Sequence, residues 1–184
     1  KEQPTPGAGV LLDLGPHLVD QAIQLSGMPS AVFADLRITR SVSLVDDYFT
    51  LLLYYPTHRI LLTSGMVFMQ VGPGYKIYGT KGCFIKNRSD VQEDLLLAGH
   101  KPGGDNWGKE DPKNYGTLST ATDGVITITT IESERGDYGK YYEAVAAAIL
   151  ENKPVPVTPQ EGINIMKVLV AAKQSHETKQ VVHL

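Results

Sequence analysis

The sequence predicts an α+β fold, in which helices pack on one face of an open, mainly antiparallel β-sheet. A helical pattern opens the chain, strand-like segments joined by short turns follow, and two helical patterns close it. Because strands and helices do not alternate as a dinucleotide-binding fold requires, they are expected to form separate layers. With 184 residues, the chain is expected to form one domain over residues 1–184.

Composition and charge narrow the possible functions. Hydrophobic residues make up 42% and charged residues 20%, which is typical of a globular domain. The net charge of −3, without a basic stripe, argues against a nucleic-acid partner. No apolar run approaches the roughly 18–20 residues of a membrane span, and the first residues do not form a signal peptide. Cys83 is the only cysteine, so an intrachain disulfide is excluded and a reducing, cytoplasmic location is expected.

The first element is a helix predicted over residues 10–26. Its apolar residues recur at steps of four, four and three, which places them on one face. This stripe consists of Leu14, Leu18, Ala22 and Leu25. Gly27 supplies a C-terminal stop. Pro16 cannot donate a backbone hydrogen bond, so a kink or a restart of the helix is expected there.

Strand patterns follow. The predicted strands cover residues 32–39, 48–55, 59–68, 75–78, 82–86 and 125–131. The first alternates apolar and polar residues, so one of its faces is expected to be buried. The second and third form a hairpin with apolar residues on both faces, so we expect the second face to be covered as well. Leu51, Leu53, Leu61 and Val67 exceed what one helix layer needs to cover, which predicts a homo-oligomer through the sheet.

Residues 87–124 are predicted to form a long polar loop with one short helix near residues 93–99. A loop of this length in a compact domain is usually functional or disordered. Two helices follow, over residues 137–150 and from Thr158 to about Ser175, and a short strand over 181–182 ends the chain. Asp137 is the expected N-cap of the first, and Glu161 completes a capping box in the second.

Two glycine-rich segments imitate nucleotide-binding motifs and fail. The segment Gly7–Leu12 begins as GxGxxG, but leucine replaces the third glycine and no strand precedes it. The segment Gly103–Glu110 matches GxxxxGK, but Glu110 replaces the serine or threonine that holds magnesium. The dispersed histidines give no metal site, and no nucleophile elbow GxSxG occurs.

Asp13 and His17 form the one pair of residues that could carry out acid–base chemistry. Residues four apart on a helix share a face, with Cβ atoms about 5–6 Å apart. A carboxylate there can orient an imidazole, which can then exchange a proton with a substrate hydroxyl. The alternative is a helix histidine with a purely structural role, and spacing alone favours that alternative.

Longer motifs resemble the second domain of the Gfo/Idh/MocA oxidoreductase family. They are Gly9–Gln21, Ile77–Gly82, Gly136–Tyr138, Tyr141–Val145 and Pro156–Gly162. They span nearly the whole chain, and the first is fairly specific. In addition, Gln92-Glu93-Asp94 and Trp107-Gly108 resemble a subgroup that includes scyllo-inositol dehydrogenases.

The resemblance implies a role for the chain. Members of this family join a Rossmann domain, which binds NAD or NADP, to a C-terminal domain for substrate binding and oligomerisation. Their catalytic set is a Rossmann-domain lysine with an aspartate and a histidine four residues apart, which match Asp13 and His17. The implied reaction is hydride transfer from a polyol or sugar CH–OH group to nicotinamide. His17 would take the hydroxyl proton and Asp13 would orient His17 or bind the substrate. The Rossmann domain and its lysine have no counterpart here, so the chain alone is expected to be inactive.

The long loop supplies further candidates for substrate binding. Polar side chains beside an aromatic ring are the types that bind sugars, and these candidates are Gln92, Glu93, Lys101, Trp107 and Tyr115. A solvated surface loop is the alternative for this segment. For the whole chain, the alternatives are a non-catalytic dimerisation module and a sugar-binding module without turnover.

Overall fold

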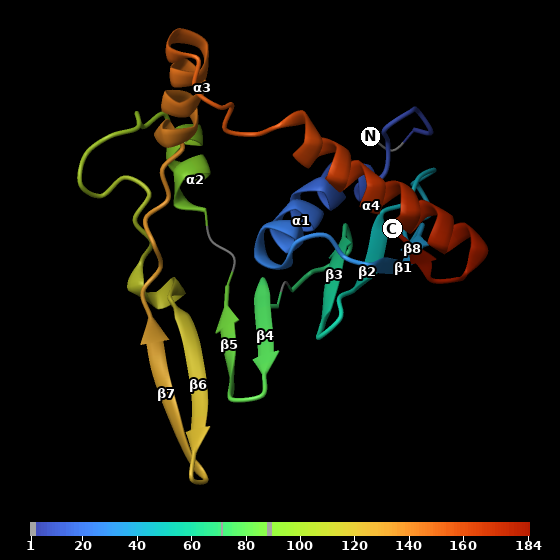
Figure 1. The fold of residues 1–184 in the computed structure, drawn as a ribbon, viewed down its shortest axis with the longest axis horizontal. Coiled ribbons are helices and arrows are strands. Elements are labelled where there is room, and N and C mark those ends of the chain that lie inside the picture. The colour runs from blue at the N-terminus through green and yellow to red at the C-terminus, as the bar shows by residue number, and fades with distance from the viewer. Residues whose placement is uncertain (1–2, 71, 88–89) are drawn as a thin grey trace. The chain divides into compact units, whose positions relative to one another are not determined.

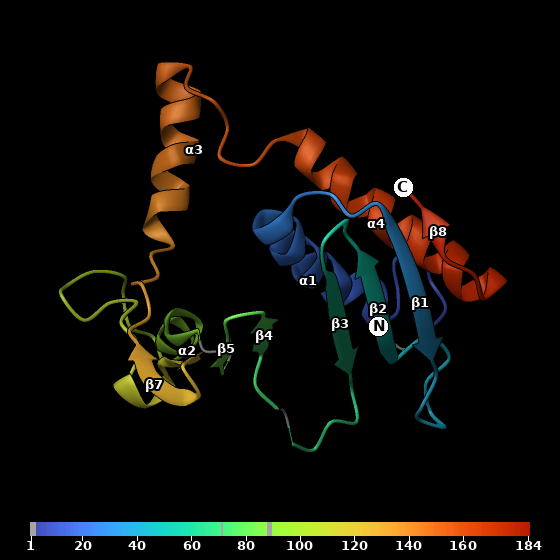
Figure 2. The same cartoon turned by 60° about the horizontal axis from the view of Figure 1, so that its bottom comes forward.

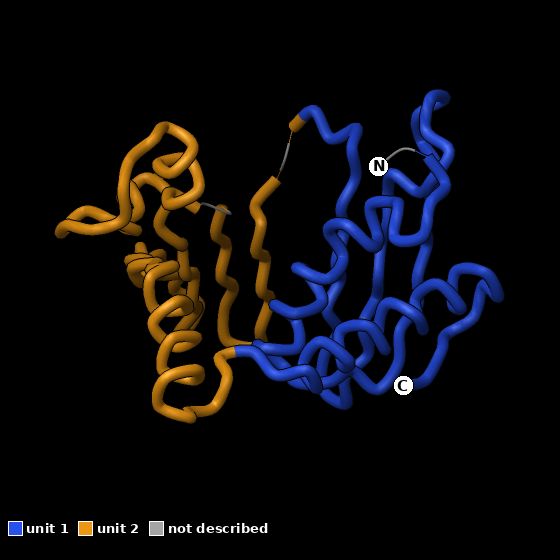
Figure 3. The backbone as a smooth tube through the Cα atoms, turned by 90° about the horizontal axis from the view of Figure 1, so that it is seen from above, with its two compact units in different colours: residues 1–69, 157–184 blue, residues 70–156 orange. Residues whose placement is uncertain are grey.

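The computed structural model describes residues 3–70, 72–87 and 90–184. Residues 1 and 2, and residues 88 and 89 of the predicted long loop, lie outside the described residues. The chain divides into two compact units, which Figure 3 colours separately. Unit 1 comprises residues 1–69 and 157–184, and unit 2 comprises residues 70–156. Each unit holds a four-stranded antiparallel sheet, so the predicted α+β class is confirmed.

The sheet of unit 1 has the strand order β3-β2-β1-β8. Its strands are β1 (Ala31–Arg37), β2 (Tyr48–Tyr54), β3 (Arg59–Gly65) and β8 (Val182–His183). The two central strands pair along their whole length, from Ala31 opposite Tyr54 to Arg37 opposite Tyr48. The predicted hairpin is confirmed, because β2 pairs with β3 in register.

Two helices, α1 (Val10–Ser26) and α4 (Pro159–Thr178), lie on the same face of this sheet (Figure 2). Every second residue of β2 is buried, as expected for a strand with one covered face. Burying a leucine or phenylalanine side chain contributes about 1.5–3 kcal/mol. The core consists of Val10, Leu11, Val19, Ala22, Val32, Ala34, Leu36, Phe49, Leu51, Leu53, Tyr55, Val168, Leu169, Ala171 and Ala172.

The face that α1 buries differs from the predicted stripe. The buried positions are Val10, Leu11, Gly15, Val19 and Ala22, and only Ala22 belongs to the predicted stripe. Leu14 and Leu25 are exposed, and Leu18 is partly buried. Glycine at position 15 explains the difference, since an added Cβ would lie 3.0 Å from Leu169 Cδ2. The bare backbone lets α4 approach α1 closely. The helix runs unbroken through Pro16, so the expected restart does not occur.

The four apolar residues that predicted an oligomer surface differ in their exposure to solvent. Leu51 and Leu53 are fully buried under the helices. The prediction that they contribute to an outer surface for oligomerisation is therefore wrong. Leu61 and Val67 are exposed, at 64% and 47%. Strand β3 ends at Gly65, three residues earlier than predicted, and Phe68 packs edge-on against Tyr48 with ring centroids 6.0 Å apart.

Helix α4 also completes the edge of β1. Because β8 pairs only with Ala31 and Val32, the later N–H groups of β1 need other partners. Ala34 N donates to Ser175 Oγ at 3.0 Å, and Leu36 N donates to His176 Nδ1 at 3.1 Å. The predicted capping box of Thr158 and Glu161 is present at the start of the helix.

The sheet of unit 2 has the order β4-β5-β6-β7 (Figure 1). Its strands are β4 (Tyr75–Gly79), β5 (Gly82–Lys86), β6 (Gly116–Thr122) and β7 (Val125–Ile131). Strand β6 corrects the prediction for residues 87–124, which gave a long loop with one short helix and no strand. Its threonine- and serine-rich sequence lacks the apolar alternation on which the prediction relied. The turn that follows it, Asp123-Gly124, has positive φ at both residues, as a tight hairpin turn requires.

Unit 2 also holds α2 (Val91–Leu97), the short 3₁₀ helix η1 (Pro112–Asn114) and α3 (Gly139–Glu151). Asp90 caps α2, since its side chain accepts a hydrogen bond from Gln92 N at 2.9 Å. Helix α3 begins two residues later than predicted. Asp137 is therefore not its N-cap, although its carboxylate accepts from Gly139 N at 2.9 Å.

Candidate active site

Helix α1 presents Asp13 and His17 on its solvent-facing side. Both residues are exposed, whereas Leu11, Gly15 and Val19 between and beside them are buried. Their spacing of one helical turn puts their Cβ atoms about 5–6 Å apart. The core of unit 1 holds the helix, and the carboxyl and imidazole groups point away from that core. The pair thus lies on the exposed side of a helix that the core of unit 1 holds in place.

The start of α1 is fixed by a residue that lies far away in the sequence. Asp46 O accepts a hydrogen bond from Val10 N at 2.8 Å, and Asp46 Oδ2 accepts one from Leu11 N at 2.8 Å. No local sequence pattern points to Asp46, because this contact joins residues 35 positions apart. A carboxylate at this helix N-terminus also excludes a nucleotide phosphate, since it already binds the amides and carries the same charge.

The second glycine-rich segment does not fit a phosphate either. The carboxylate of Glu110 pairs with Lys86 Nζ at 2.8 Å, and the Glu110 side chain is only 8% exposed. The carbonyl oxygen of Gly104 accepts a hydrogen bond from Arg135 Nη2 at 2.7 Å. These contacts tie the segment to its neighbours in unit 2. The groups of this segment that a phosphate would need are therefore engaged within unit 2.

The five loop candidates all lie in unit 2, and the structure brings two of them together. Trp107 is 5% exposed and its Nε1–H donates to Gln92 Oε1 at 3.1 Å. The same oxygen accepts a hydrogen bond from Tyr138 N at 2.8 Å. The ring of Trp107 is therefore packed in the interior of the unit, contrary to the expectation of an open aromatic platform. Its apolar body and the buried amide of Gln92 hold the segment in place.

The other three candidates have accessible groups. Glu93 on α2 and Lys101 in the following loop are exposed. Tyr115 is partly buried, and its hydroxyl donates to Glu132 Oε1 at 3.0 Å. Desolvation, together with this hydrogen bond, raises the pKa of the Tyr115 phenol above its ordinary value.

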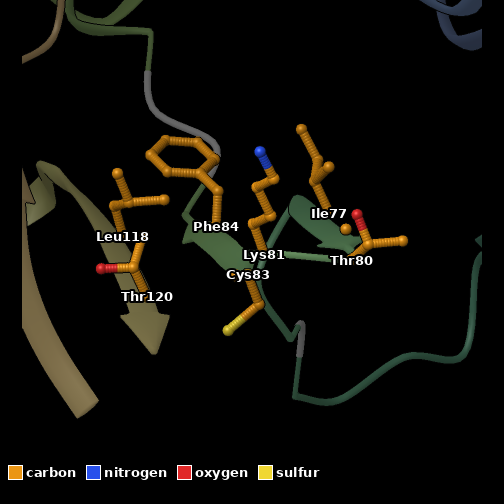
Figure 4. A pocket seen from close by; sticks show the side chains of 9 residues that line it. Ile77, Thr80, Lys81, Cys83, Phe84, Leu118 and Thr120 are labelled. Carbon is orange, nitrogen blue, oxygen red and sulfur yellow. The ribbon is translucent and has the colours of Figure 1, made fainter. Parts of the chain in front are cut away.

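A shallow hollow of about 370 Å³ lies on the sheet of unit 2 (Figure 4). Its lining residues are Ile77, Gly79, Thr80, Lys81, Gly82, Cys83, Phe84, Leu118 and Thr120. Register places Ile77, Phe84 and Leu118 on one face of the sheet, because they are directly opposite one another on neighbouring strands. Cys83 points to the other side of β5, as Figure 4 shows. The lining is mainly apolar and suits contact with another surface better than acid–base chemistry.

Neither a membrane-spanning helix nor a candidate metal cluster occurs among the residues that the structure describes. None of the helices in this part of the chain combines the length and apolar character needed to cross a bilayer. Over the same residues, histidine, cysteine and acidic side chains do not gather in groups of three or more that could hold a metal ion.

Comparison with known proteins places the chain. A family model described as "Oxidoreductase family, C-terminal alpha/beta domain" matches residues 1–184. The chain belongs to the Gfo/Idh/MocA oxidoreductase family. The helix that carries Asp13 and His17 is therefore part of a Gfo/Idh/MocA C-terminal domain, as the sequence motifs indicated.

Individual relatives agree with this placement. The chain is 39% identical to the scyllo-inositol 2-dehydrogenase (NADP(+)) IolW of Bacillus subtilis, over all of this chain and 51% of that protein. The solved structure of YvaA from Bacillus subtilis superposes with a TM-score of 0.94 at 38% identity, covering 100% of this chain and 53% of that one. An oxidoreductase from Bacillus cereus gives a TM-score of 0.86 at 28% identity, covering 100% and 54%. The Gfo/Idh/MocA domain thus spans about half the length of these relatives.

Proposed function

We propose that this Gfo/Idh/MocA domain is the substrate-binding and oligomerising part of an NAD(P)-dependent oxidoreductase that acts on a CH–OH group of a polyol or sugar. The observation that carries the proposal is the exposed pair of Asp13 and His17, one turn apart on a helix whose other side is locked into the core. The polyol is supported by the relative that is named a scyllo-inositol 2-dehydrogenase.

His17 is proposed as the general base. As the alcohol becomes a ketone, an imidazole nitrogen of His17 takes the hydroxyl proton while the C–H bond breaks. Asp13, on the same helix face, orients the imidazole for this proton transfer. The nicotinamide cofactor, when bound, supplies the acceptor for the hydride. The residues of this chain thus handle the proton and the orientation of the substrate.

NAD or NADP would be bound mainly by a nucleotide-binding domain outside this chain. The start of α1 carries the Asp46 carboxylate, and the Gly103–Glu110 segment is tied to Lys86 and Arg135. Neither arrangement leaves a row of backbone amides for a pyrophosphate. We therefore propose that the chain alone is inactive and that its activity depends on the joined domain.

Additional substrate contacts are proposed for the accessible loop residues Glu93, Lys101 and Tyr115. An exposed carboxylate, an ammonium group and a phenol are suited to the hydroxyl groups of a polyol. Gln92 and Trp107 are given a different role, since their side chains bind each other in the interior of unit 2. They would hold the segment that carries the other three.

The partner of the chain is proposed to be another copy of itself, contacted through sheet surface. Several apolar strand side chains of unit 2 are exposed, including Tyr78 at 75%, Ile126 at 70% and Ile128 at 69%. Register places Ile128 opposite Ser119, and Ser119 opposite Cys83, which is itself opposite Tyr78. These side chains therefore share one face. An exposed apolar face of this kind marks an interaction surface.

The same exposed face supports the second candidate function, a dimerisation module without catalysis. The two candidates are distinguished by joining the chain to its nucleotide-binding domain and screening polyols and sugars for NAD⁺ and NADP⁺ reduction. The oxidoreductase proposal expects turnover by the joined protein and none by the chain alone, with calorimetry of the chain showing no binding at millimolar cofactor. Assembly without turnover on any polyol or sugar would favour the module.

A further inference from the structure

Helix α1 begins without a cap from its own segment. Gly9 occupies the N-cap position and has no side chain that could accept hydrogen bonds from the first turn. The first N–H groups of any helix lack partners within the helix, so they must find them elsewhere. Asp46 supplies two acceptors. Its carbonyl oxygen accepts a hydrogen bond from Val10 N, and its Oδ2 accepts one from Leu11 N, both at 2.8 Å, although Asp46 and Leu11 are 35 positions apart in the sequence. Its negative charge also favours the positive end of the helix dipole.

The lack of a side chain at Gly9 leaves space for the Asp46 carboxylate. Its φ of 98° lies in the region that residues with a side chain rarely adopt. A Cβ at this position would lie 2.1 Å from Asp46 Oδ1, which is far inside van der Waals contact. Gly9 and Asp46 therefore form a matched pair, in which one residue leaves the space that the other fills.

Asp46 is itself held by the framework of the sheet through its neighbour. Asp47 N donates to Arg37 O at 2.9 Å, and Met66 N donates to Asp47 O at 2.9 Å. The buried Asp47 carboxylate accepts hydrogen bonds from the backbone and side chains of Thr39 and Arg40. A continuous set of contacts thus leads from the strands, through Asp47 and Asp46, to the first turn of α1.

We infer that Asp46 is a positioning residue, which fixes the first turn of α1 so that Asp13 and His17 keep the geometry needed for proton transfer; the inference rests on the proposed function. Asp13 is the residue whose N–H closes this turn, donating to Gly9 O at 3.1 Å. His17 follows one turn later on the same face. Loosening the first turn displaces Asp13 first, and His17 then loses its orienting partner.

The test uses the full-length oxidoreductase and compares Asp46→Ala with Asp46→Asn, which keeps an oxygen acceptor at the same position. The matched control is Glu177→Ala, at an exposed acidic residue on α4. Hydrogen exchange of the amides at residues 10–13 measures the cap, while kcat and KM measure the reaction. Loss of an N-cap in Asp46→Ala should speed that exchange by about 5-fold. The kcat should fall roughly 10- to 100-fold, with a smaller change in KM, because small displacements of reacting groups are costly.

The Asn variant should keep most of the exchange protection and of the kcat, and Glu177→Ala should change neither. If Asp46→Ala does not fold, Gly9→Ala breaks the same contact from the other side and is read in the same way. Unchanged exchange at residues 10–13 overturns the inference, whatever happens to kcat. If Asp46→Ala shows faster exchange but a normal kcat, and His17→Ala is inactive, the inference on Asp46 is also overturned. The chemistry would then need His17 but not the cap. Normal kcat in both Asp46→Ala and His17→Ala shows instead that the proposed function itself is wrong, and the inference falls with it.

Discussion

The indole N–H of Trp107 donates to the side-chain oxygen of Gln92 at 3.1 Å, and both side chains are buried. Because the same oxygen accepts from Tyr138 N, Gln92 joins the segment after α2 to the start of α3. Arg135 Nε adds a hydrogen bond to the carbonyl oxygen of Trp107. The buried amide of Gln92 and the guanidinium of Arg135 therefore both hold the long polar segment in place.

Removing the two partners of this hydrogen bond should have unequal effects. Trp107→Phe leaves Gln92 Oε1 bonded to Tyr138 N, and should cost about 1 kcal/mol for the hydrogen bond in addition to lost packing. Gln92→Leu leaves the buried Trp107 N–H without an acceptor, at about 1–3 kcal/mol, and also removes the acceptor of the partly buried Tyr138 N–H. Urea unfolding measures both, followed by circular dichroism. Trp107 is the only tryptophan, so its fluorescence also reports on unit 2 in the Gln92 variant. A Gln92→Leu protein more stable than Trp107→Phe would contradict this account.

Glycine 15 should tolerate a side chain poorly. A valine there meets Leu169 Cδ2 and Leu11 Cδ1, which lie 3.0 and 3.3 Å from the position of its Cβ, and overpacking costs typically about 1–3 kcal/mol. Gly162 on α4 is the matched control, because its Cβ would meet nothing within 4 Å. Thermal melts should show Gly162→Ala stabilised by about 0.5–1 kcal/mol. Gly15→Ala should gain less, and Gly15→Val should melt earlier than the unmodified protein. Equal gains for both alanine variants would exclude close packing of α1 on α4.

Asp47 should make stability depend on pH in the acid range. Burial would raise the pKa of its carboxyl, but the hydrogen bonds from Thr39 and Arg40 outweigh burial and hold the pKa well below its ordinary value. An unfolded aspartate titrates near pH ~3.9. The stabilisation is therefore complete above that pH and is lost as the pH falls toward the folded-state pKa. The difference in melting temperature between the unmodified protein and Asp47→Asn should be constant from pH 7 to about 5 and shrink below about pH 4. A difference that widens with acid would contradict this.

The proposed assembly through the sheet of unit 2 should be sensitive to charge. In the full-length protein, replacing Ile126 and Ile128 together by lysine places two like charges on a face that would meet its own copy. Both residues are already exposed, so the fold should survive. Light scattering should show at least a dimer for the unmodified protein and a smaller species for the variant, with an unchanged circular dichroism spectrum. A monomer at tens of micromolar before any substitution would count against the assembly.

Elements with local signals could be predicted from the sequence. The capping box of α4 and the hairpin of β2 and β3 are examples, because turn and cap residues act on their immediate neighbours. The buried face of α1 could not be predicted by counting apolar residues. Gly15 is not hydrophobic, yet it is buried because it lies against Leu169. Strand β6 lacks an apolar alternation, and only the turn residues Asp123-Gly124 at its end give a local signal.

In the candidate site, too, local features could be predicted from the sequence and long-range contacts could not. Asp13 and His17 lie one turn apart on helix α1, as their spacing predicts. The cap from Asp46 and the burial of Trp107 depend on partners 35 and 15 residues away, so local patterns did not reveal them. Contacts of this kind follow from tertiary packing.

The central claim is that His17 transfers a proton and is not needed for folding. The most direct test is steady-state kinetics of the full-length His17→Ala enzyme over a pH series, with thermal melts alongside. The account predicts that kcat falls by about 10²–10⁴-fold, far more than substrate binding weakens, because general-base catalysis acts as the transition state forms. Melting temperatures should agree within a few degrees, since His17 is exposed. A variant that keeps near-normal kcat, or that unfolds, would show that His17 has a structural role and would contradict the account.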